Sequence, residues 1–139
     1  QHERPERRRR APLPQESRVA AVIEQEGRFL LARRPTRGRL GGMWEFPGGL
    51  MNAGEGAVQA LPRVLGNSLG IVVEPQRALQ PIAHVFTHVR VMYHPVVSAL
   101  IRGDPVAAAY DDVRWLAADE LDSVALPRAQ QRIAAMIGR

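Results

Sequence analysis

The sequence predicts a single α/β domain, in which helices cover the two faces of a mixed β-sheet. Segments rich in β-branched and aromatic residues, which favour strands, are interrupted by two segments whose apolar residues recur at helical spacing. Strands and helices in this mixed order are typical of such a sandwich. A chain of 139 residues, of which 45% are hydrophobic, is long enough to bury a core of its own.

The first segment, residues 1–17, is expected to be a disordered basic linker, and the domain to occupy residues 18–139. The linker contains Pro5, Pro12 and Pro14 together with four consecutive arginines, and it has almost no apolar content. A linker of this kind would connect the domain to something upstream in a parent protein.

A β-hairpin is predicted next. Residues 19–23 and 29–31 are strand-like apolar runs, and Glu26-Gly27 between them favours a tight turn. After a loop rich in arginine and glycine, Trp44-Glu45-Phe46 predicts a short strand, which Pro47-Gly48-Gly49 should end.

Residues 55–69 predict a helix, because apolar residues recur there at the spacing of one helical face. These residues are Val58, Leu61, Leu65 and Leu69. Pro62 lies inside the pattern, and since an interior proline costs about 3 kcal/mol, we expect it to kink and weaken the helix.

Strands are predicted in the second half of the chain from its β-branched and aromatic content. Their ranges are 71–73, 78–86, 89–101 and 115–116. The middle two should run antiparallel around Thr87-His88. A capped turn at Asp119 and a final helix over residues 127–137 complete the domain.

Composition excludes several classes of protein. The chain has no cysteine, which excludes disulfides, iron–sulfur clusters and cysteine-ligated zinc. No apolar run approaches the roughly 20 residues needed to cross a bilayer, and the arginine-rich start has no apolar signal core after it. We therefore expect no membrane association and a cytoplasmic location.

The positive charge comes entirely from arginine, which supplies all nineteen basic residues of a chain with a formal net charge of +5. Genome base composition explains this usage as well, but the guanidinium fork binds phosphate oxygens in two places and favours a polyanionic partner. Arg33, Arg34, Arg37 and Arg39 lie close together with no acid among them. They are our candidates for contacts with a phosphate backbone, and ordinary solvated arginines are the alternative.

A set of residues with a characteristic spacing follows the predicted short strand. Gly49, Glu55, Arg63 and Gly70 fall on the spacing of the Nudix signature, as does Leu65. The segment therefore resembles the Nudix superfamily. The resemblance implies a Nudix-like α/β/α sandwich whose signature helix, in that family, carries metal-binding glutamates.

Three of those glutamates are missing. The resemblance places them one, four and five positions after the signature arginine, where this chain has Val64, Asn67 and Ser68. Magnesium needs several oxygen ligands, mainly carboxylates, to neutralise phosphates and activate water. Glu55 alone cannot supply them, and Glu45 is expected to be structural. We therefore expect no bound metal and no metal-dependent hydrolysis of nucleoside triphosphates.

Further segments of the sequence restrict the resemblance to one family within the superfamily. They are residues 30–35, 41–49, 84–88, 111–115 and 125–129. Together they resemble the C-terminal domain of the MutY family of adenine-DNA glycosylases, which act on adenine opposite 8-oxoguanine. The resemblance covers residues 18–137. The piece over residues 44–49 is shared with MutT-type hydrolases, whereas its combination with a Phe-Thr-His segment and a broken signature is more specific.

This resemblance implies a domain that recognises 8-oxoguanine in DNA without carrying out the excision. The implied partners are duplex DNA containing 8-oxoguanine and an N-terminal glycosylase domain in the same parent chain. The family's catalytic carboxylates and iron–sulfur cysteines have no counterparts in this chain. We expect no cofactor in this domain, and we expect a monomer.

The implied recognition segment is Phe86-Thr87-His88. 8-Oxoguanine carries a hydrogen on N7 and an oxygen on C8, so the Thr87 hydroxyl can accept from the first, while that hydroxyl or a backbone N–H donates to the second. Phe86 would wedge or stack against a neighbouring base, and His88 would donate to a phosphate or hold the loop. On the residues alone, the alternative is a core Phe86 and an ordinary turn. His84 and His94 are expected to be structural.

Two other functions remain open. One is a standalone MutT-like pyrophosphohydrolase with a non-standard metal site, acting on a nucleoside diphosphate derivative such as 8-oxo-dGTP. The other is an interaction module that docks a protein partner. Magnesium-dependent turnover would identify the first, and equal binding to 8-oxoguanine:adenine and guanine:adenine duplexes would leave the recognition segment without support.

Overall fold

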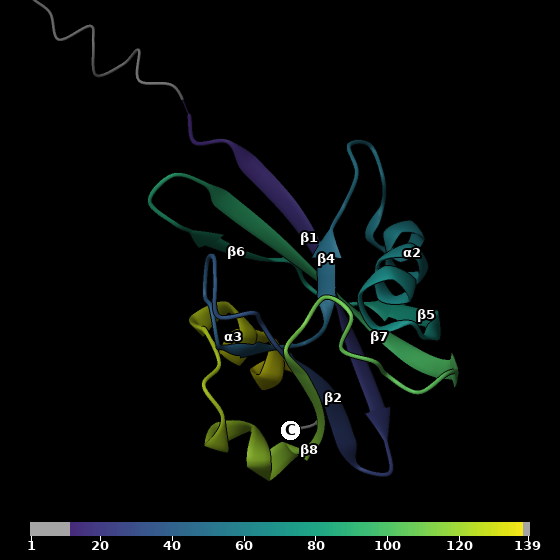
Figure 1. Cartoon of the computed structure of the whole chain (residues 1–139). Helices are drawn as coiled ribbons and strands as arrows, with labels where there is room; N and C mark the ends of the chain where they lie inside the picture. Colours follow the sequence, from purple (N-terminus) through teal and green to yellow (C-terminus); the bar gives the residue numbers. More distant parts are fainter. Residues whose placement is uncertain (1–11, 138–139) are drawn as a thin grey trace, which may run out of the picture.

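The computed structural model describes residues 12–137 (Figure 1). The elements follow the predicted order, with two longer helices and one short 3₁₀-helix, η1. They are β1 (Gln15–Gln25), β2 (Arg28–Arg33), β3 (Trp44–Glu45), β4 (Gly48–Leu50), α2 (Ala57–Leu69), β5 (Val72–Ala78), β6 (Ile82–Val85), β7 (Arg90–Arg102), β8 (Asp112–Ala117), η1 (Ala118–Ser123) and α3 (Arg128–Met136).

The strands form one mixed sheet with α2 on one face and α3 on the other, as Figure 1 shows. The main path runs β3-β2-β1-β7-β5, while β4 pairs with β1, β6 with β7 and β8 with β2. β1 and β7 are parallel and the other pairs are antiparallel. The predicted α/β/α sandwich with a mixed sheet is therefore confirmed. None of the helices in the described part of the chain is long and apolar enough to cross a membrane.

Strand β1 starts earlier than predicted. Residues 15–17 pair in parallel with residues 90–92 of β7, so the sheet extends upstream of the expected domain start at residue 18. Backbone pairing can extend a strand beyond its apolar stretch into polar residues. The rest of the predicted linker, residues 1–11, lies outside the described residues.

The predicted hairpin of β1 and β2 is confirmed, and its residues build both cores. Val19, Ala21 and Ile23 lie in the cluster that contains the α2 residues, whereas Ala20 and Val22 lie in the cluster that contains the α3 residues. Successive side chains of a strand point to opposite faces, and here both faces are covered. This explains why the strand is apolar without alternation.

The predicted strand over residues 44–46 is β3, but the glycines after it continue into another strand, β4. A Cβ atom on Gly48 would lie 1.8 Å from the Val19 carbonyl oxygen, and one on Gly49 would lie 2.9 Å from Cγ1 of Val64. Only glycine allows β4 to approach both β1 and α2 so closely.

Helix α2 begins two residues later than predicted and ends at Gly70, whose φ of 68° is left-handed. All 13 residues are helical, so Pro62 does not break the helix. The missing proline amide costs only the bond to the carbonyl of Val58, a residue that is half exposed. Leu61, Leu65 and Leu69 are buried, as their spacing predicted.

The predicted strand over residues 78–86 proves to be two strands, because β5 ends at Ala78 and β6 begins at Ile82, just after Pro81. β6 and β7 form the predicted antiparallel hairpin. The final helix, α3, lies within its predicted range, and Gln130 on it accepts a hydrogen bond of 3.0 Å from the Phe46 amide. This bond fixes α3 to the strand that leads into the candidate site.

Candidate functional site

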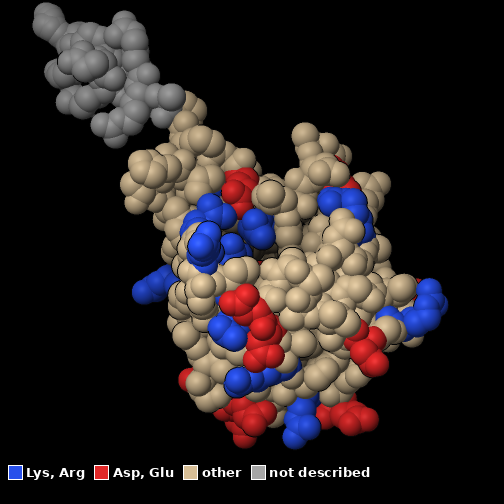
Figure 2. All heavy atoms as spheres, viewed as in Figure 1, with Lys and Arg blue, Asp and Glu red and all other residues tan. Residues whose placement is uncertain are grey.

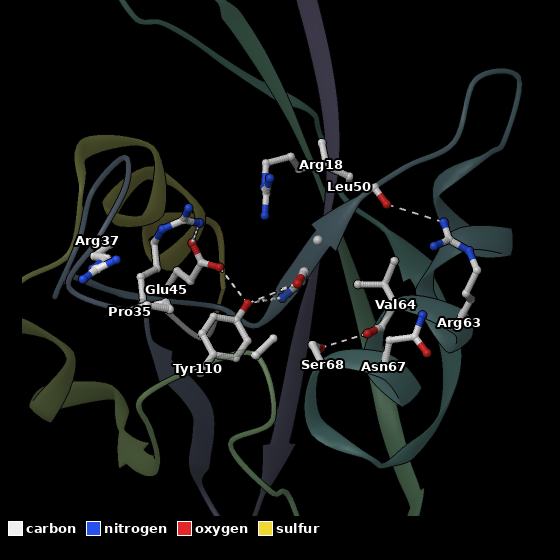
Figure 3. A pocket seen from close by; sticks show the side chains of 14 residues that line it. Arg18, Pro35, Arg37, Glu45, Leu50, Arg63, Val64, Asn67, Ser68 and Tyr110 are labelled. Atoms are coloured by element: carbon white, nitrogen blue, oxygen red, sulfur yellow. Dashed lines mark hydrogen bonds and ion pairs between the residues drawn. The ribbon is translucent and has the colours of Figure 1, made fainter.

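A cavity of about 450 Å³ opens between α2, β4 and the loop that follows β2 (Figure 3). Helix α2 supplies one wall with Val64, Asn67 and Ser68. Opposite that wall lie Glu45 and Tyr110. The other lining residues are Arg18, Arg34, Pro35, Arg37, Gly48, Gly49, Leu50, Arg63 and Ala109. The Nudix-like segment therefore forms one side of this cavity.

The retained residues of that segment shape its loop and helix. Glu55 accepts hydrogen bonds from the Asn52 amide at 2.8 Å and from Nη2 of Arg63 at 2.6 Å. The bond from Arg63, followed by that from Asn52, lowers the pKa of the Glu55 carboxyl. Arg63 also donates to the Leu50 carbonyl at 3.4 Å. Gly49 packs against Val64, and Gly70 ends the helix, so each retained residue has a structural task.

The residues that replace the expected glutamates do not suit a metal ion. Val64 offers no side-chain oxygen, Ser68 donates its hydroxyl hydrogen to the Val64 carbonyl at 2.8 Å, and Asn67 contributes one neutral carbonyl. Within residues 12–137, no group of three or more histidine or acidic side chains is placed to hold a metal ion. Magnesium prefers several carboxylate oxygens, so the donor set does not fit the ion that the Nudix resemblance implies.

Glu45 is buried and fully engaged, as expected for a structural acid. Its Oε1 accepts from Nη1 of Arg34 at 3.1 Å, and its Oε2 accepts from the Tyr110 hydroxyl at 2.7 Å. The Tyr110 oxygen in turn accepts from the Gly48 amide at 2.9 Å. Burial, and then the charge of Glu45, raises the pKa of Tyr110 well above its usual value, so the hydroxyl keeps its proton. This network fixes the cavity wall opposite α2.

Phe86, Thr87 and His88 lie at the tip of the β6–β7 hairpin. The Phe86 amide donates to the Val89 carbonyl at 2.8 Å, which closes a two-residue turn over Thr87 and His88. Both turn residues are exposed. Phe86 is half-buried, packs against the α3-side core and meets the His84 ring edge-on at 4.5 Å. Phe86 therefore anchors the tip, which presents the other two side chains.

The strand that begins the domain also supports this tip. The Arg39 guanidinium lies over the Phe86 ring, 4.9 Å from its centroid, and donates to Oε2 of Glu16 at 2.7 Å. Burial opposes ionisation of Glu16, but the hydrogen bonds from Arg39 and Arg18 outweigh it and lower the pKa of that carboxyl. Glu16 on β1 thus holds an arginine on the aromatic anchor of the tip.

The structure gives the four candidate phosphate-binding arginines different surroundings. Arg33 lies 6.0 Å from the Trp44 ring centroid and 3.9 Å from Asp111. Arg34 is paired with Glu45, and Arg39 with Glu16. Arg37 lines the cavity and has no carboxylate partner among residues 12–137. Figure 2 shows arginine side chains gathered around a hollow on the face viewed in Figure 1, with acidic side chains below the hollow in the middle of the face and again at its lower end. A contact of these four arginines with DNA stays a prediction.

Sequence reasoning missed three residues that shape these features, namely Glu16, Arg18 and Tyr110. Glu16 fell in the expected linker, and Arg18 is the first residue of the expected domain and belongs to no motif. Tyr110 lies after a run of alanines with no motif of its own, yet it is more than nine-tenths buried. Its one sequence signal is that it directly precedes the aspartates at 111 and 112, part of a segment on which the resemblance rests.

Comparisons with known proteins found a matching family model, similar proteins and similar structures. A family model described as a NUDIX domain matches residues 18–136. The human protein named adenine DNA glycosylase is 30% identical over 138 residues, which cover 93% of this chain and 25% of that protein. The Escherichia coli protein named CTP pyrophosphohydrolase is 49% identical over 53 residues, covering 38% of this chain and 39% of that protein.

The fold is found in a solved structure as well. The crystal structure of a MutT NUDIX hydrolase from Burkholderia pseudomallei has a TM-score of 0.81 and 23% identity, and the match covers 89% of this chain and 98% of that one. The chain spans only about a quarter of the length of the adenine DNA glycosylases that it matches. With a NUDIX domain model matching most of its length and a NUDIX hydrolase sharing its fold, this chain belongs to the NUDIX domain family.

Proposed function

We propose that this chain recognises 8-oxoguanine in duplex DNA without hydrolysing nucleotides, as the C-terminal domain of an adenine DNA glycosylase. The observation that carries the proposal is the cavity wall formed by Val64, Asn67 and Ser68, which lacks the carboxylates that hydrolysis of a pyrophosphate requires. The similarity to adenine DNA glycosylases over 93% of the chain supports the choice of ligand. The partners would be the damaged duplex and a glycosylase domain in the same parent chain, and no cofactor is needed here.

The hairpin tip offers the chemistry that this recognition requires. Thr87 is exposed, and no hydrogen bond joins its hydroxyl to another described residue, so the hydroxyl is available to the N7 hydrogen or the C8 oxygen of 8-oxoguanine. His88 is exposed beside it and can donate to a phosphate. Because Phe86 is held by the core and by Arg39, it would serve as a fixed support more than as a freely inserting wedge.

Binding to two matched duplexes tests the proposal. The chain should bind a duplex with one 8-oxoguanine:adenine pair more tightly than the same duplex with guanine:adenine, as measured by fluorescence anisotropy at fixed salt. Equal affinities would leave the tip without a role in base recognition and would contradict the proposal.

We expect no magnesium-dependent hydrolysis. With 8-oxo-dGTP or CTP as substrate, release of phosphate or pyrophosphate should not exceed that of the Glu55→Ala variant, since Glu55 is the one signature glutamate left. The similarity to a CTP pyrophosphohydrolase makes the standalone hydrolase the competing function. Turnover well above the Glu55→Ala control would establish that alternative.

The Glu16→Gln variant is expected to weaken the preference for the 8-oxoguanine duplex a few-fold. Glutamine removes the charge that holds Arg39 over Phe86, and a partly exposed ion pair of this kind is worth about 0.2 to 1 kcal/mol. The readout is the ratio of the two duplex affinities, which a loss of general stability would not change. Glu74→Gln, an exposed glutamate on β5, is the matched control and should leave the ratio unaltered.

A further inference from the structure

The end of the β6–β7 hairpin, residues 82–93, contains one arginine and no acidic residue. This arginine, Arg90, lies on the face opposite the aromatic anchor. Val91 belongs to the core on the α3 side, and successive side chains of a strand point to opposite faces, so Arg90 points away from α3. Phe86 packs on the α3 side, with the Arg39 guanidinium over its ring. The two arginines therefore lie on opposite faces of the hairpin.

Within the described part of the chain, Arg90 has no carboxylate partner. Its side chain is exposed, and it takes part in none of the ion pairs formed among residues 12–137. Glu16 is the register partner of Val91, the next residue of β7, but its carboxylate lies on the other face and binds two other arginines. The guanidinium of Arg90 is therefore available to an external anion.

The backbone at Arg90 is held on both sides. Arg90 is the first residue of β7, which at this end of the sheet lies between β1 and β6. Its amide donates to the Pro14 carbonyl at 2.9 Å, and its register partner on β6 is Val85. Register partners on neighbouring strands point to the same face, and Val85 is 57% exposed. The hairpin thus presents an arginine from a fixed position, beside an apolar side chain and two residues after His88.

A hairpin that reads 8-oxoguanine with its tip has DNA on its flanks. Guanine presents N7 in the major groove, and this groove admits a two-stranded β-ribbon. A ribbon that enters with its tip is flanked by sugar–phosphate backbone, so side chains just behind the tip lie within reach of phosphates. In Figure 1 the loop that joins β6 and β7 lies at the left of the view and α2 at the right, which leaves this flank of the hairpin open.

We propose that Arg90 contacts a phosphate of the damaged duplex and thereby fixes the orientation of the hairpin tip on the DNA. This inference rests on the proposed function and adds a residue to it. Three of the four arginines that the sequence suggested for backbone contacts lie near carboxylates that compete for their guanidinium groups, whereas Arg90 does not. Phosphate contacts position a protein on DNA and carry no sequence information directly. Arg90 therefore holds Thr87 at the base without itself distinguishing one base from another.

The salt dependence of duplex binding tests this assignment. Affinities for the 8-oxoguanine:adenine and guanine:adenine duplexes are measured by fluorescence anisotropy between about 50 and about 200 mM salt. One lost phosphate contact reduces the slope of log affinity against log salt concentration by about 0.9, which at 0.1 M salt corresponds to about an eightfold loss of affinity. We expect this change in Arg90→Gln, by the same factor for both duplexes.

The matched control is Arg102→Gln. Arg102 is the last residue of β7, is exposed, and takes part in none of the ion pairs among the described residues. The variant therefore removes the same charge from the same strand at its other end, and it should keep the slope of the unchanged chain. Arg90→Lys keeps the charge and should keep most of the slope. If Arg90→Gln does not fold, as judged by circular dichroism, Arg90→Met removes the same charge and keeps the apolar stem.

An unaltered slope in the folded variant without the Arg90 charge would overturn the proposal. So would an equal change in Arg102→Gln, which would indicate a general effect of net charge, or the absence of duplex binding at low salt. A changed ratio of the two affinities with an unaltered slope would place Arg90 at a base and would also overturn it. The slope can be measured with the undamaged duplex alone. Equal affinities of the unchanged chain for the two duplexes would therefore contradict base recognition and leave the test of Arg90 intact.

Discussion

The Thr87→Val variant is expected to lower the preference for the 8-oxoguanine:adenine duplex over the guanine:adenine duplex by about tenfold. Valine keeps the shape of threonine and removes the hydroxyl, and one specific contact with a base is worth about 1 to 3 kcal/mol. A change of 1.4 kcal/mol corresponds to about a factor of ten in affinity. Since Thr87 is exposed in a two-residue turn, the fold should not change.

The chain offers a close control for this experiment in its other threonine. Thr36 is exposed in the arginine-rich loop, so Thr36→Val makes the same chemical change away from the hairpin tip. Fluorescence anisotropy with both duplexes should give an unaltered preference for Thr36→Val. A Thr87→Val variant with the full preference would mean that the hydroxyl does not take part in recognition and that a backbone group or another residue does.

Much of the fold could be predicted from local patterns. The β1–β2 hairpin, the turn at Thr87-His88 and the two long helices are set by apolar spacing and by turn residues that lie next to each other in the sequence. The start of β1 was not predictable in this way. Residues 15–17 are polar, and they form part of strand β1 because β7, which lies far along the chain, pairs with their backbone.

The partners of the four candidate arginines could not be predicted from the sequence. A cluster without acids nearby in the sequence suggested four equivalent contacts with a phosphate backbone. In the folded chain, Arg34 and Arg39 meet Glu45 and Glu16. An arginine that binds phosphate and one that binds a carboxylate look alike in sequence, because both need the same fork of donors and the partner comes from tertiary structure. Arg37 alone keeps the surroundings that the cluster suggested.

The missing signature glutamates were predictable, because their positions relative to Arg63 are local along one helix. The buried network on the opposite wall was not predictable. Tyr110 reaches Glu45 across 65 residues of sequence, and no short motif connects the two. The α2 side of the cavity could be recognised from the signature spacing. The opposite side, where Tyr110 binds Glu45, could be recognised only from the structure.

That network leads to the largest expected effect on stability, which is the effect of Tyr110→Phe. Phenylalanine keeps the buried ring and removes the hydroxyl that donates to Glu45 at 2.7 Å and accepts from the Gly48 amide at 2.9 Å. Each of the two buried polar groups left without this partner costs about 1 to 3 kcal/mol, so the free energy of unfolding should fall by about 2 to 6 kcal/mol. Urea denaturation followed by circular dichroism measures this change.

Tyr93→Phe is the matched control for that loss. Tyr93 is also buried, but no hydrogen bond joins its hydroxyl to another described residue, so the same change should cost less than about 1 kcal/mol. Equal effects of the two substitutions would mean that the loss at residue 110 comes from burial of the ring edge and not from the bonds to Glu45 and Gly48. A large effect confined to Tyr110→Phe would show that the cavity wall opposite α2 is stabilised by the hydrogen bonds of this one hydroxyl. The other wall is formed by helix α2 and would not depend on them.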